Sequence, residues 1–367
     1  MNRTDFRWLN FLILMAVASA CAADDASAPD SEAGWTIDPE PLLVIRDDDP
    51  DDPVPMVEVT SATLLPTDEI VVTDRFGPAI HVFNLDGEVV RSPGQRGEGP
   101  GEYLAPSLVT TCGTDSLFVF DYNRRLVLVM DFEGALIREF RPVNRPDTIK
   151  CLTDSTFLVL DLPDEYPPLS GDGTRGYATV WVSDHQGQEL FRVGSFPHVE
   201  HRVMGRNADI AGVGGRIVVG TADSAMVEVY GEGGEPLGTL PIGQSPRAPT
   251  PEEYERELEF WLTPARGDPE RRDILRSRYD QVPPPDEVYP YRELLGDPHG
   301  VLWAVASVLG AETTRLQAVD STGTLRANFT VPNGFEPLEI GEDYMIGRQV
   351  AEDFSQELVM YRLLRSP

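Results

Sequence analysis

The sequence predicts an all-β protein that folds as a six-bladed β-propeller, a ring of six small sheets around an axis. Two observations predict it. Glycine and proline account for 32 residues each among the 367. Their combined share of the chain is above the average of about 12%, so turns are frequent. Short apolar runs alternate with the turns, and the pattern recurs about every 45–50 residues, a period typical of propeller blades.

The repeat is clearest in the first two units. The first unit contains the β-like runs Asp68–Asp74 and Ala79–Asp86, followed by a tight turn. The second unit repeats this order in the same register with Asp115–Asp121 and Leu126–Asp131. The turn glycines of successive units are Gly87, Gly134, Gly187, Gly233 and Gly323. The first four are spaced 47, 53 and 46 residues apart, the longer last gap holds an insertion, and six units can be counted.

Closure of the ring is predicted from the two ends of the repeat. The sixth unit lacks an outermost strand, whereas Pro41–Arg46 reads as a β-strand without a partner in its own unit. An open ring would expose the edge of a sheet, which promotes aggregation. We therefore expect Pro41–Arg46 to complete the sixth blade, so that residues 35–367 form one closed propeller.

The N-terminal segment predicts export. Residues 1–20 combine two arginines, an apolar stretch and small residues, as a signal peptide does. Residues 18–21 read Ala-Ser-Ala-Cys and resemble a bacterial lipobox, so Cys21 is expected to carry a lipid and residues 21–34 to form a flexible tether. The predicted location is the bacterial cell envelope, periplasmic or at the outer membrane. The alternative is an ordinary signal peptide and a secreted, soluble protein.

The charge of the chain limits its partners. The formal charge is -31, and binding to a nucleic-acid backbone depends on clustered cations that displace counterions. Nucleic acid is therefore not expected as a partner. We expect a monomer that contacts the membrane through its lipid alone and binds a peptide, a glycan or a small molecule.

One segment between the first two units is distinctive. Gly94–Tyr103 reads Gly-Gln-Arg-Gly-Glu-Gly-Pro-Gly-Glu-Tyr. Together with the surrounding repeats, it resembles the bacterial six-bladed β-propeller family related to NHL-repeat proteins. The resemblance covers residues 35–367 and implies the propeller fold. Because that family is united by its fold and not by one reaction, the resemblance implies no activity.

The long connections are expected to gather on one face. When the four strands of a blade are counted outward from the axis, the connections from the second to the third strand and those between blades share one side, here called the loop face. The long connections are 92–106, 141–149, 162–177, 197–209 and 243–290. Because binding residues concentrate on loops held by a rigid scaffold, this face is the predicted binding site. The candidate residues are Arg75, Glu98, Tyr103, Arg124, Arg202, Arg206 and Trp261. Structural ion pairs are the alternative role for these arginines.

The insertion before the fifth unit predicts a helical hairpin at about 250–282. Thr250–Glu253 has the pattern of a capping box with a first-turn proline. Tyr254, Leu258 and Trp261 follow at helical spacing, and Asp268 begins a second helix. The hairpin is expected over the loop face, either as a lid or as simple packing.

The cysteines of the body are expected to remain unbridged, although a bridge stays an open alternative. Cys112 and Cys151 precede equivalent strands of neighbouring units. Equivalent points in adjacent blades of a six-fold ring are as far apart as their distance from the axis. A disulfide requires Cα atoms within about 7 Å, so only positions beside the channel would qualify.

No cofactor or metal site is predicted. His198 and His201 could supply two nitrogens, but they lie in a loop and lack the helical arrangement of zinc proteases. Asp47–Pro53 is rich in carboxylates without the spacing of a calcium loop, so a solvated run of charge is expected there.

These observations predict a non-catalytic binding module for a peptide, a glycan or a small anionic ligand on the loop face. The alternative is a propeller hydrolase or lyase that acts on an envelope carbohydrate or lactone with an axial metal under the hairpin. Gluconolactonase-like hydrolases use such a metal, and Glu98-Gly99-Pro100 weakly resembles their motif. Three or more oxygen ligands converging on the axis would favour the enzyme.

Overall fold

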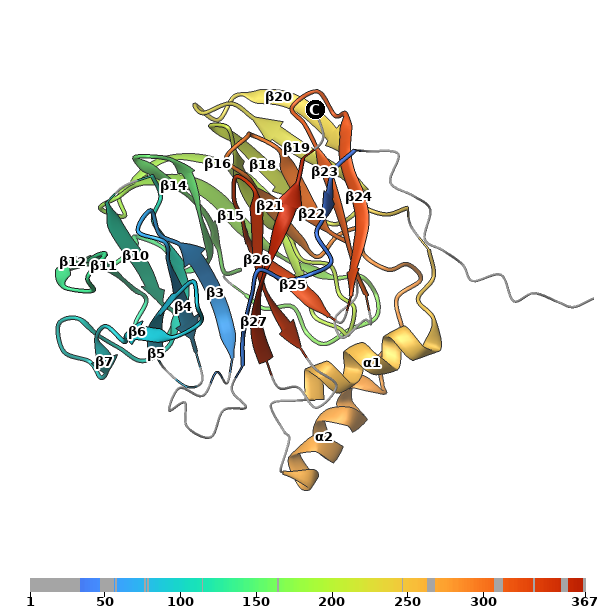
Figure 1. Cartoon of the computed structure of the whole chain (residues 1–367). Coiled ribbons are helices and arrows are strands. Elements are labelled where there is room, and N and C mark those ends of the chain that lie inside the picture. The colour runs from blue at the N-terminus through green and yellow to red at the C-terminus, as the bar shows by residue number, and fades with distance from the viewer. Residues whose placement is uncertain are drawn as a thin grey trace, which may run out of the picture. The chain divides into compact units, whose positions relative to one another are not determined.

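Six antiparallel sheets form the body of the protein, one for each predicted repeat (Figure 1). This computed structural model describes residues 34–46, 56, 58–75, 77, 79–113, 115–163, 165–245, 247–262, 268–306, 313–332, 334–350 and 356–365. The predicted signal peptide, the predicted lipidation site Cys21, most of the predicted tether and the acidic run Asp47–Pro53 lie outside these residues. The fold class is confirmed: the chain is an all-β, six-bladed propeller with two inserted helices.

The blades follow the chain in order, each from its innermost strand outward. Blade one is β3 (Val59–Leu64), β4 (Glu69–Asp74), β5 (Ala79–Asn84) and β6 (Val89–Arg91). Blade two is β9 (Pro106–Thr110), β10 (Ser116–Asp121), β11 (Leu126–Asp131) and β12 (Leu136–Phe140). Blade three is β13 (Pro146–Thr153), β14 (Thr156–Asp161), β15 (Arg175–Asp184) and β16 (Glu189–Glu200). Between blades one and two, β7 (Gln95–Arg96) and β8 (Glu102–Tyr103) form a short parallel pair.

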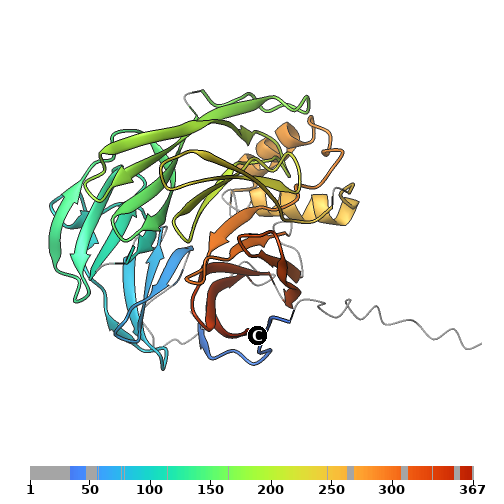
Figure 2. The same ribbon diagram turned by 90° about the horizontal axis from the view of Figure 1, so that it is seen from above.

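Blade four is β17 (Asp209–Val213), β18 (Arg216–Gly220), β19 (Met226–Tyr230) and β20 (Pro236–Pro241). Blade five is β21 (Glu293–Gly296), β22 (Leu302–Val305), β23 (Thr313–Val319) and β24 (Leu325–Pro332). Blade six is β25 (Phe335–Ile340), β26 (Tyr344–Val350) and β27 (Gln356–Leu364), with two N-terminal strands outside β27. The six innermost strands contact one another in chain order, and β25 contacts β3, which closes the ring (Figure 2).

Closure by the N-terminal segment is confirmed, with one strand more than the sequence predicts. β2 (Leu43–Ile45) pairs with β27, with Leu43 opposite Met360. β1 (Thr36–Ile37) also pairs with β27, with Thr36 opposite Leu364. The outermost strand of blade six is therefore built from two short pieces.

A glycine turn joins the third and fourth strands of most blades. Gly87 has φ of 85°, a region that favours glycine, and its N–H bonds the carbonyl of Asn84. In blade four Gly234, and not the predicted Gly233, holds this position, with φ of 84°. Gly87 packs against Leu43 of β2. The N-terminal strand thus supports the turn of blade one and joins the first blade to the last.

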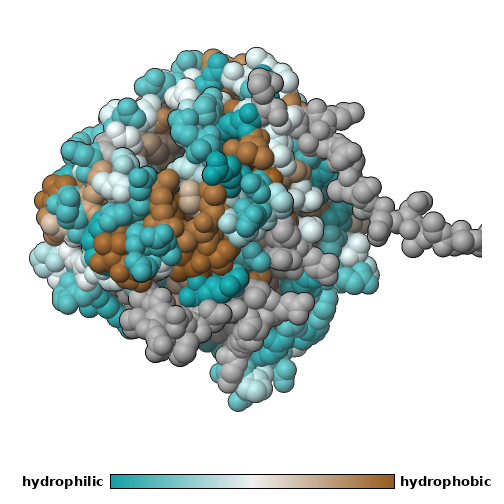
Figure 3. Space-filling model, viewed as in Figure 1, coloured by the Kyte–Doolittle hydropathy of each residue, from teal (hydrophilic) through white to brown (hydrophobic). Residues whose placement is uncertain are grey.

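Apolar side chains fill the spaces between adjacent blades. One core cluster joins residues of blades one and two, and another joins residues of blades two and three. The surface is largely hydrophilic, although Figure 3 shows an apolar area on the face that Figure 1 presents.

The predicted hairpin is present as α1 (Pro251–Leu262) and α2 (Pro269–Tyr279). The capping box is confirmed, since Thr250 Oγ1 accepts the Glu253 N–H at 3.2 Å and Glu253 Oε2 accepts the Thr250 N–H at 2.9 Å. Leu258 and Leu262 of α1 are buried in the core of blades four and five, whereas α2 buries no residue. None of the helices in the described part of the chain is long and apolar enough to cross a bilayer.

The expectation for the cysteines is wrong, because Cys112 and Cys151 form a disulfide with a Cα–Cα distance of 5.2 Å. The two residues are not equivalent in the ring. Cys112 lies in the turn between β9 and β10 with φ of 45°, whereas Cys151 lies inside β13 opposite Phe157. The turn of blade two reaches across to blade three, where Gly113 packs against Asp154. The distance expected between equivalent positions of adjacent blades therefore does not apply to these two cysteines.

Candidate functional site

Three innermost strands carry a β-bulge at the same place. The pairing of β3 with β4, of β9 with β10 and of β13 with β14 shifts by one residue near the start of each innermost strand. The extra residues are Thr60, Ser107 and Asp147, one in each of blades one, two and three. The corresponding pairs in blades four and five run without a shift. Because a bulge redirects a side chain, these three blades present a polar residue to the axis.

Aspartates at the ends of the neighbouring second strands hold the incoming chain in place. Asp121 is buried at the end of β10, where its carboxylate accepts the N–H groups of Leu104 at 2.6 Å and Ala105 at 3.2 Å. In blade one, Asp74 accepts the N–H of Glu58 at 3.2 Å. In blades one and two, the connection that enters the innermost strand is thereby fixed just before its bulge.

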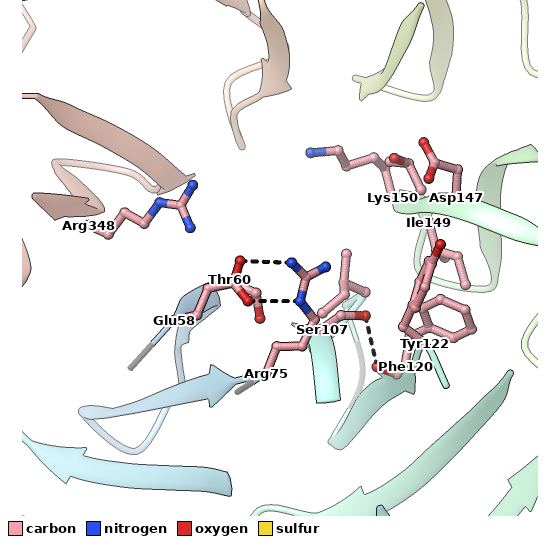
Figure 4. Close-up of a pocket in the computed structure, with 12 residues that line it drawn as sticks. Glu58, Thr60, Arg75, Ser107, Phe120, Tyr122, Asp147, Ile149, Lys150 and Arg348 are labelled. Carbon is pink, nitrogen blue, oxygen red and sulfur yellow. Dashed lines mark hydrogen bonds and ion pairs between the residues drawn. The ribbon is translucent and has the colours of Figure 1, made fainter. Parts of the chain in front are cut away.

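The bulged residues line a cavity of about 380 Å³ at the propeller axis, here called the axial cavity (Figure 4). Its lining comes from the starts of innermost strands, from the loops after β4 and β10, and from β26, so it opens on the predicted loop face. The lining residues are Glu58, Thr60, Arg75, Ser107, Leu108, Phe120, Tyr122, Asp147, Thr148, Ile149, Lys150 and Arg348. A second cavity of about 210 Å³ shares Thr60, Leu108, Ile149 and Lys150 and continues along the innermost strands.

Three cationic side chains from three different blades point into the axial cavity. Figure 4 shows Arg75 of blade one, Lys150 of blade three and Arg348 of blade six around one open space. Arg75 donates two hydrogen bonds to the Glu58 carboxylate, at 2.7 and 2.8 Å. Arg348 bonds Glu336 at 2.7 Å and also donates to the carbonyl of Val59 at 2.7 Å.

Lys150 is the one lysine of the sequence. Its Nζ lies 3.5 Å from Oε1 of Glu293, and its side chain is 22% exposed. Burial opposes the charged ammonium, but the carboxylates of Glu293 and Asp209 outweigh burial and raise the pKa of Lys150. Burial also raises the pKa of Asp209 to about 6. Lys150 is therefore charged at neutral pH, with its ammonium at the cavity.

A fixed carboxylate stands on the same strand. Asp147 Oδ2 lies 3.2 Å from Nε2 of the buried His198. Because Nδ1 of His198 accepts the N–H of Ala208 at 3.2 Å, the ring proton resides on Nε2 and is donated to Asp147. Tyr122 also lines the cavity and is 37% exposed.

The structure separates the seven candidate residues into different places, and of these only Arg75 lines the axial cavity. Arg124 donates to the carbonyls of Glu98 at 3.0 Å and Gly99 at 3.2 Å, and also to that of Glu102. Tyr103 is buried, and its hydroxyl accepts the N–H of Ile80 at 3.3 Å. The glycine-rich connection is thus stabilised from within, while the side chain of Glu98 is exposed.

The remaining candidates lie between blades three and four and in the hairpin. Arg202 and Arg206 line a separate cavity of about 370 Å³. Arg202 is buried and donates to the carbonyl of Pro283 at 2.6 Å, and Arg206 bonds Glu200 at 2.7 Å. Trp261 packs edge-on against Tyr279 of α2. Neither α1 nor α2 contributes to the lining of the axial cavity, so the hairpin packs on blades four and five instead.

Sequence reasoning missed Lys150, Arg348 and Asp147. A usable signal for Lys150 was its uniqueness in the chain, combined with its position in a run that precedes a predicted strand. Asp147 lines the cavity because a β-bulge redirects its side chain. The pattern of the sequence repeats does not reveal this bulge. Within the described part of the chain, no three His, Cys, Asp or Glu side chains converge as a metal site would require.

Comparison with known proteins agrees with this architecture. The family model described as "6-bladed beta-propeller" (DUF5128) matches residues 53–152. The chain is a six-bladed propeller. Its structure is similar to that of a protein of Bacteroides fragilis described as exported, with a TM-score of 0.54 and 12% identity over 91% of this chain and 96% of that one. It is also similar to a DUF4221 protein of Bacteroides vulgatus, with a TM-score of 0.53 and 8% identity over 90% of this chain and 99% of that one. These identities show the fold alone. No curated protein sequence matches the chain.

Proposed function

We propose that this protein is an exported binding protein that holds a small anionic ligand in its axial cavity. The observation that carries the proposal is the convergence of Arg75, Lys150 and Arg348, from three blades, on one cavity at the loop face. Guanidinium groups bind carboxylates and phosphates in a defined geometry. The charged Lys150 adds a further donor, which lies 3.5 Å from its partner Glu293. Cavities of about 300–1,000 Å³ are typical of small-molecule sites.

Export is supported by two independent features. The Cys112–Cys151 disulfide fits an oxidising compartment, and the N-terminal sequence has the pattern of a signal peptide. We further propose that Cys21 carries a lipid anchor. Growth with labelled palmitate should label the wild-type protein but not Cys21→Ser, and Cys21→Ser should leave the membrane fraction. An unlabelled wild-type protein would remove the anchor from the proposal.

The binding proposal is tested by titration calorimetry of the purified protein with citrate, at low salt and at about 0.5 M salt. We expect citrate to bind, the affinity to fall with salt because the contacts are ionic, and Arg75→Ala and Lys150→Gln each to lower it at least tenfold. Arg326→Ala is the matched control, because Arg326 pairs with Asp320 in the turn on the opposite face. Binding that is equal in Arg75→Ala, Lys150→Gln and Arg326→Ala would refute the site.

A further inference from the structure

The axial cavity also contains acidic groups, and the two that line it are held differently. Glu58 receives two hydrogen bonds from Arg75, so its charge is neutralised by a cavity cation. Asp147 has no such partner. Among the described residues no arginine or lysine lies within ion-pair distance of Asp147, and His198 alone bonds its carboxylate.

The contact with His198 fixes Asp147 in place without removing its charge. His198 is 3% exposed and lies on β16, the outermost strand of the same blade. Its Nδ1 is occupied by the N–H of Ala208, so a neutral ring donates Nε2–H to Asp147. Asp147 is itself the extra residue of the β13 bulge, and its side chain is 33% exposed. A carboxylate is thus held at the cavity wall and remains available to a positive group.

Aromatic side chains line the same cavity as this carboxylate. Tyr122 lines the cavity and is 37% exposed, and Tyr166 is 58% exposed. Burial raises the pKa of Tyr166, and the charges of Asp147 and Tyr122 raise it further. A cavity that holds both a carboxylate and aromatic rings is a favourable environment for an ammonium group.

We propose that the ligand of the axial cavity is a short peptide with a free amino terminus. Its ammonium would lie at Asp147 and its carboxylate at Lys150, Arg75 and Arg348. This inference rests on the proposed function and names the chemical class of its ligand. Asp147 and Lys150 are three residues apart on β13, so their Cα atoms are at most about 10 Å apart. Two or three peptide residues, at about 3.3–3.6 Å each when extended, match this backbone separation better than a single amino acid does.

The test compares tri-alanine, N-acetyl-tri-alanine and citrate by calorimetry on the full-length protein. We expect tri-alanine to bind and acetylation, which removes the ammonium, to lower its affinity at least tenfold. Asp147→Asn should lower the affinity for tri-alanine by a similar factor and leave citrate binding unchanged or stronger. Asp86→Asn, an exposed acid in the turn on the opposite face, is the matched control. Circular dichroism should show that both variants are folded.

A positioning role for His198 gives a second measurement. His198→Gln can still donate a hydrogen bond to Asp147, whereas His198→Leu cannot. Affinity for tri-alanine should therefore be largely retained in the first variant and reduced in the second, with citrate binding equal in both.

The outcomes separate this inference from the proposed function. If citrate binds through Arg75 and Lys150 but the two peptides bind equally, or tri-alanine does not bind, the peptide inference is wrong and the anion site stands. If Asp147→Asn leaves tri-alanine binding unchanged, the inference is also wrong. If neither citrate nor tri-alanine binds, both proposals are overturned.

Discussion

Arg75 and Arg124 follow the second strands of neighbouring blades, yet they do different things. Arg75 holds Glu58 at the edge of the axial cavity. Arg124 donates to three backbone carbonyls of the glycine-rich connection and lines no cavity of the axis. The difference lies in their partners, because Arg75 pairs with a carboxylate at an open cavity whereas Arg124 is held by backbone carbonyls of a loop. An arginine in a loop is thus assigned to binding or to bracing by its surroundings.

Arg202 is the extreme case of a bracing arginine, and its removal should have the largest effect on stability. Its side chain is 6% exposed, bonds Glu200, and reaches the carbonyls of Gly171 and Pro283. Its loss leaves the carbonyls of Gly171 and Pro283 without this charged donor, at about 1–3 kcal/mol for each, while Arg206 still pairs with Glu200. We expect Arg202→Ala to lower the free energy of unfolding by about 2–4 kcal/mol in urea denaturation. Citrate affinity of the folded fraction should be unchanged, and a loss of citrate affinity would contradict the division into two kinds of arginine.

Arg124→Ala should have an intermediate effect. Hydrogen bonds from a charged donor contribute more than neutral ones, but Arg124 is only half-buried, so we expect a loss of about 1–2 kcal/mol. The glycine-rich connection should also become more sensitive to limited proteolysis between Gly94 and Tyr103. Citrate should bind as in the wild type. Unchanged proteolysis would show that the three carbonyl contacts do not stabilise the connection.

Arg75→Ala should have the opposite effect, with little loss of stability and a large loss of citrate affinity. The Arg75–Glu58 pair is partly exposed, so its contribution to the free energy of unfolding is at most about 1 kcal/mol. Citrate affinity should nevertheless fall at least tenfold. A stability loss as large as that of Arg202→Ala, measured in the same urea series, would make Arg75 a brace and remove it from the site.

The smallest expected effect is a pH dependence of stability at His185, which lies on the face opposite the loop face. Arg138 donates to the carbonyl of His185 at 2.6 Å. Burial, and then the nearby Arg138, lower the pKa of His185. The folded state therefore favours the neutral ring, so stability should fall as pH drops below about 6.5, where the unfolded chain gains a proton. Thermal melts at pH 5.5 and 7.5 should show a smaller difference for His185→Gln than for wild type, with citrate binding equal at pH 7.5.

The sequence was sufficient for the features that repeat. Strand order, the turn glycine Gly87, the capping box at Thr250 and the closing strand all depend on local pattern and on the need to cover a sheet edge. The site could not be predicted in this way. Asp147 reaches the axis through a register shift. The carboxylates that keep Lys150 charged, Asp209 of blade four and Glu293 of blade five, are distant from it in the sequence. The disulfide could not be predicted either, because the turn at Cys112 crosses to the next blade. Cys112 and Cys151 therefore do not occupy equivalent positions in their repeats.

The pairing of β1 and β2 with β27 constrains the order of folding. Ile45 pairs with Leu358, so one of the first strands of the body waits for one of the last to be synthesised. Such a long sequence separation makes closure slow, because the loop entropy is lost before the contact forms. Until then Leu43 and Ile45, which are buried in the finished ring, are exposed to solvent and to other chains. An apolar sheet edge that stays open until the last strand is made raises the risk of aggregation during synthesis.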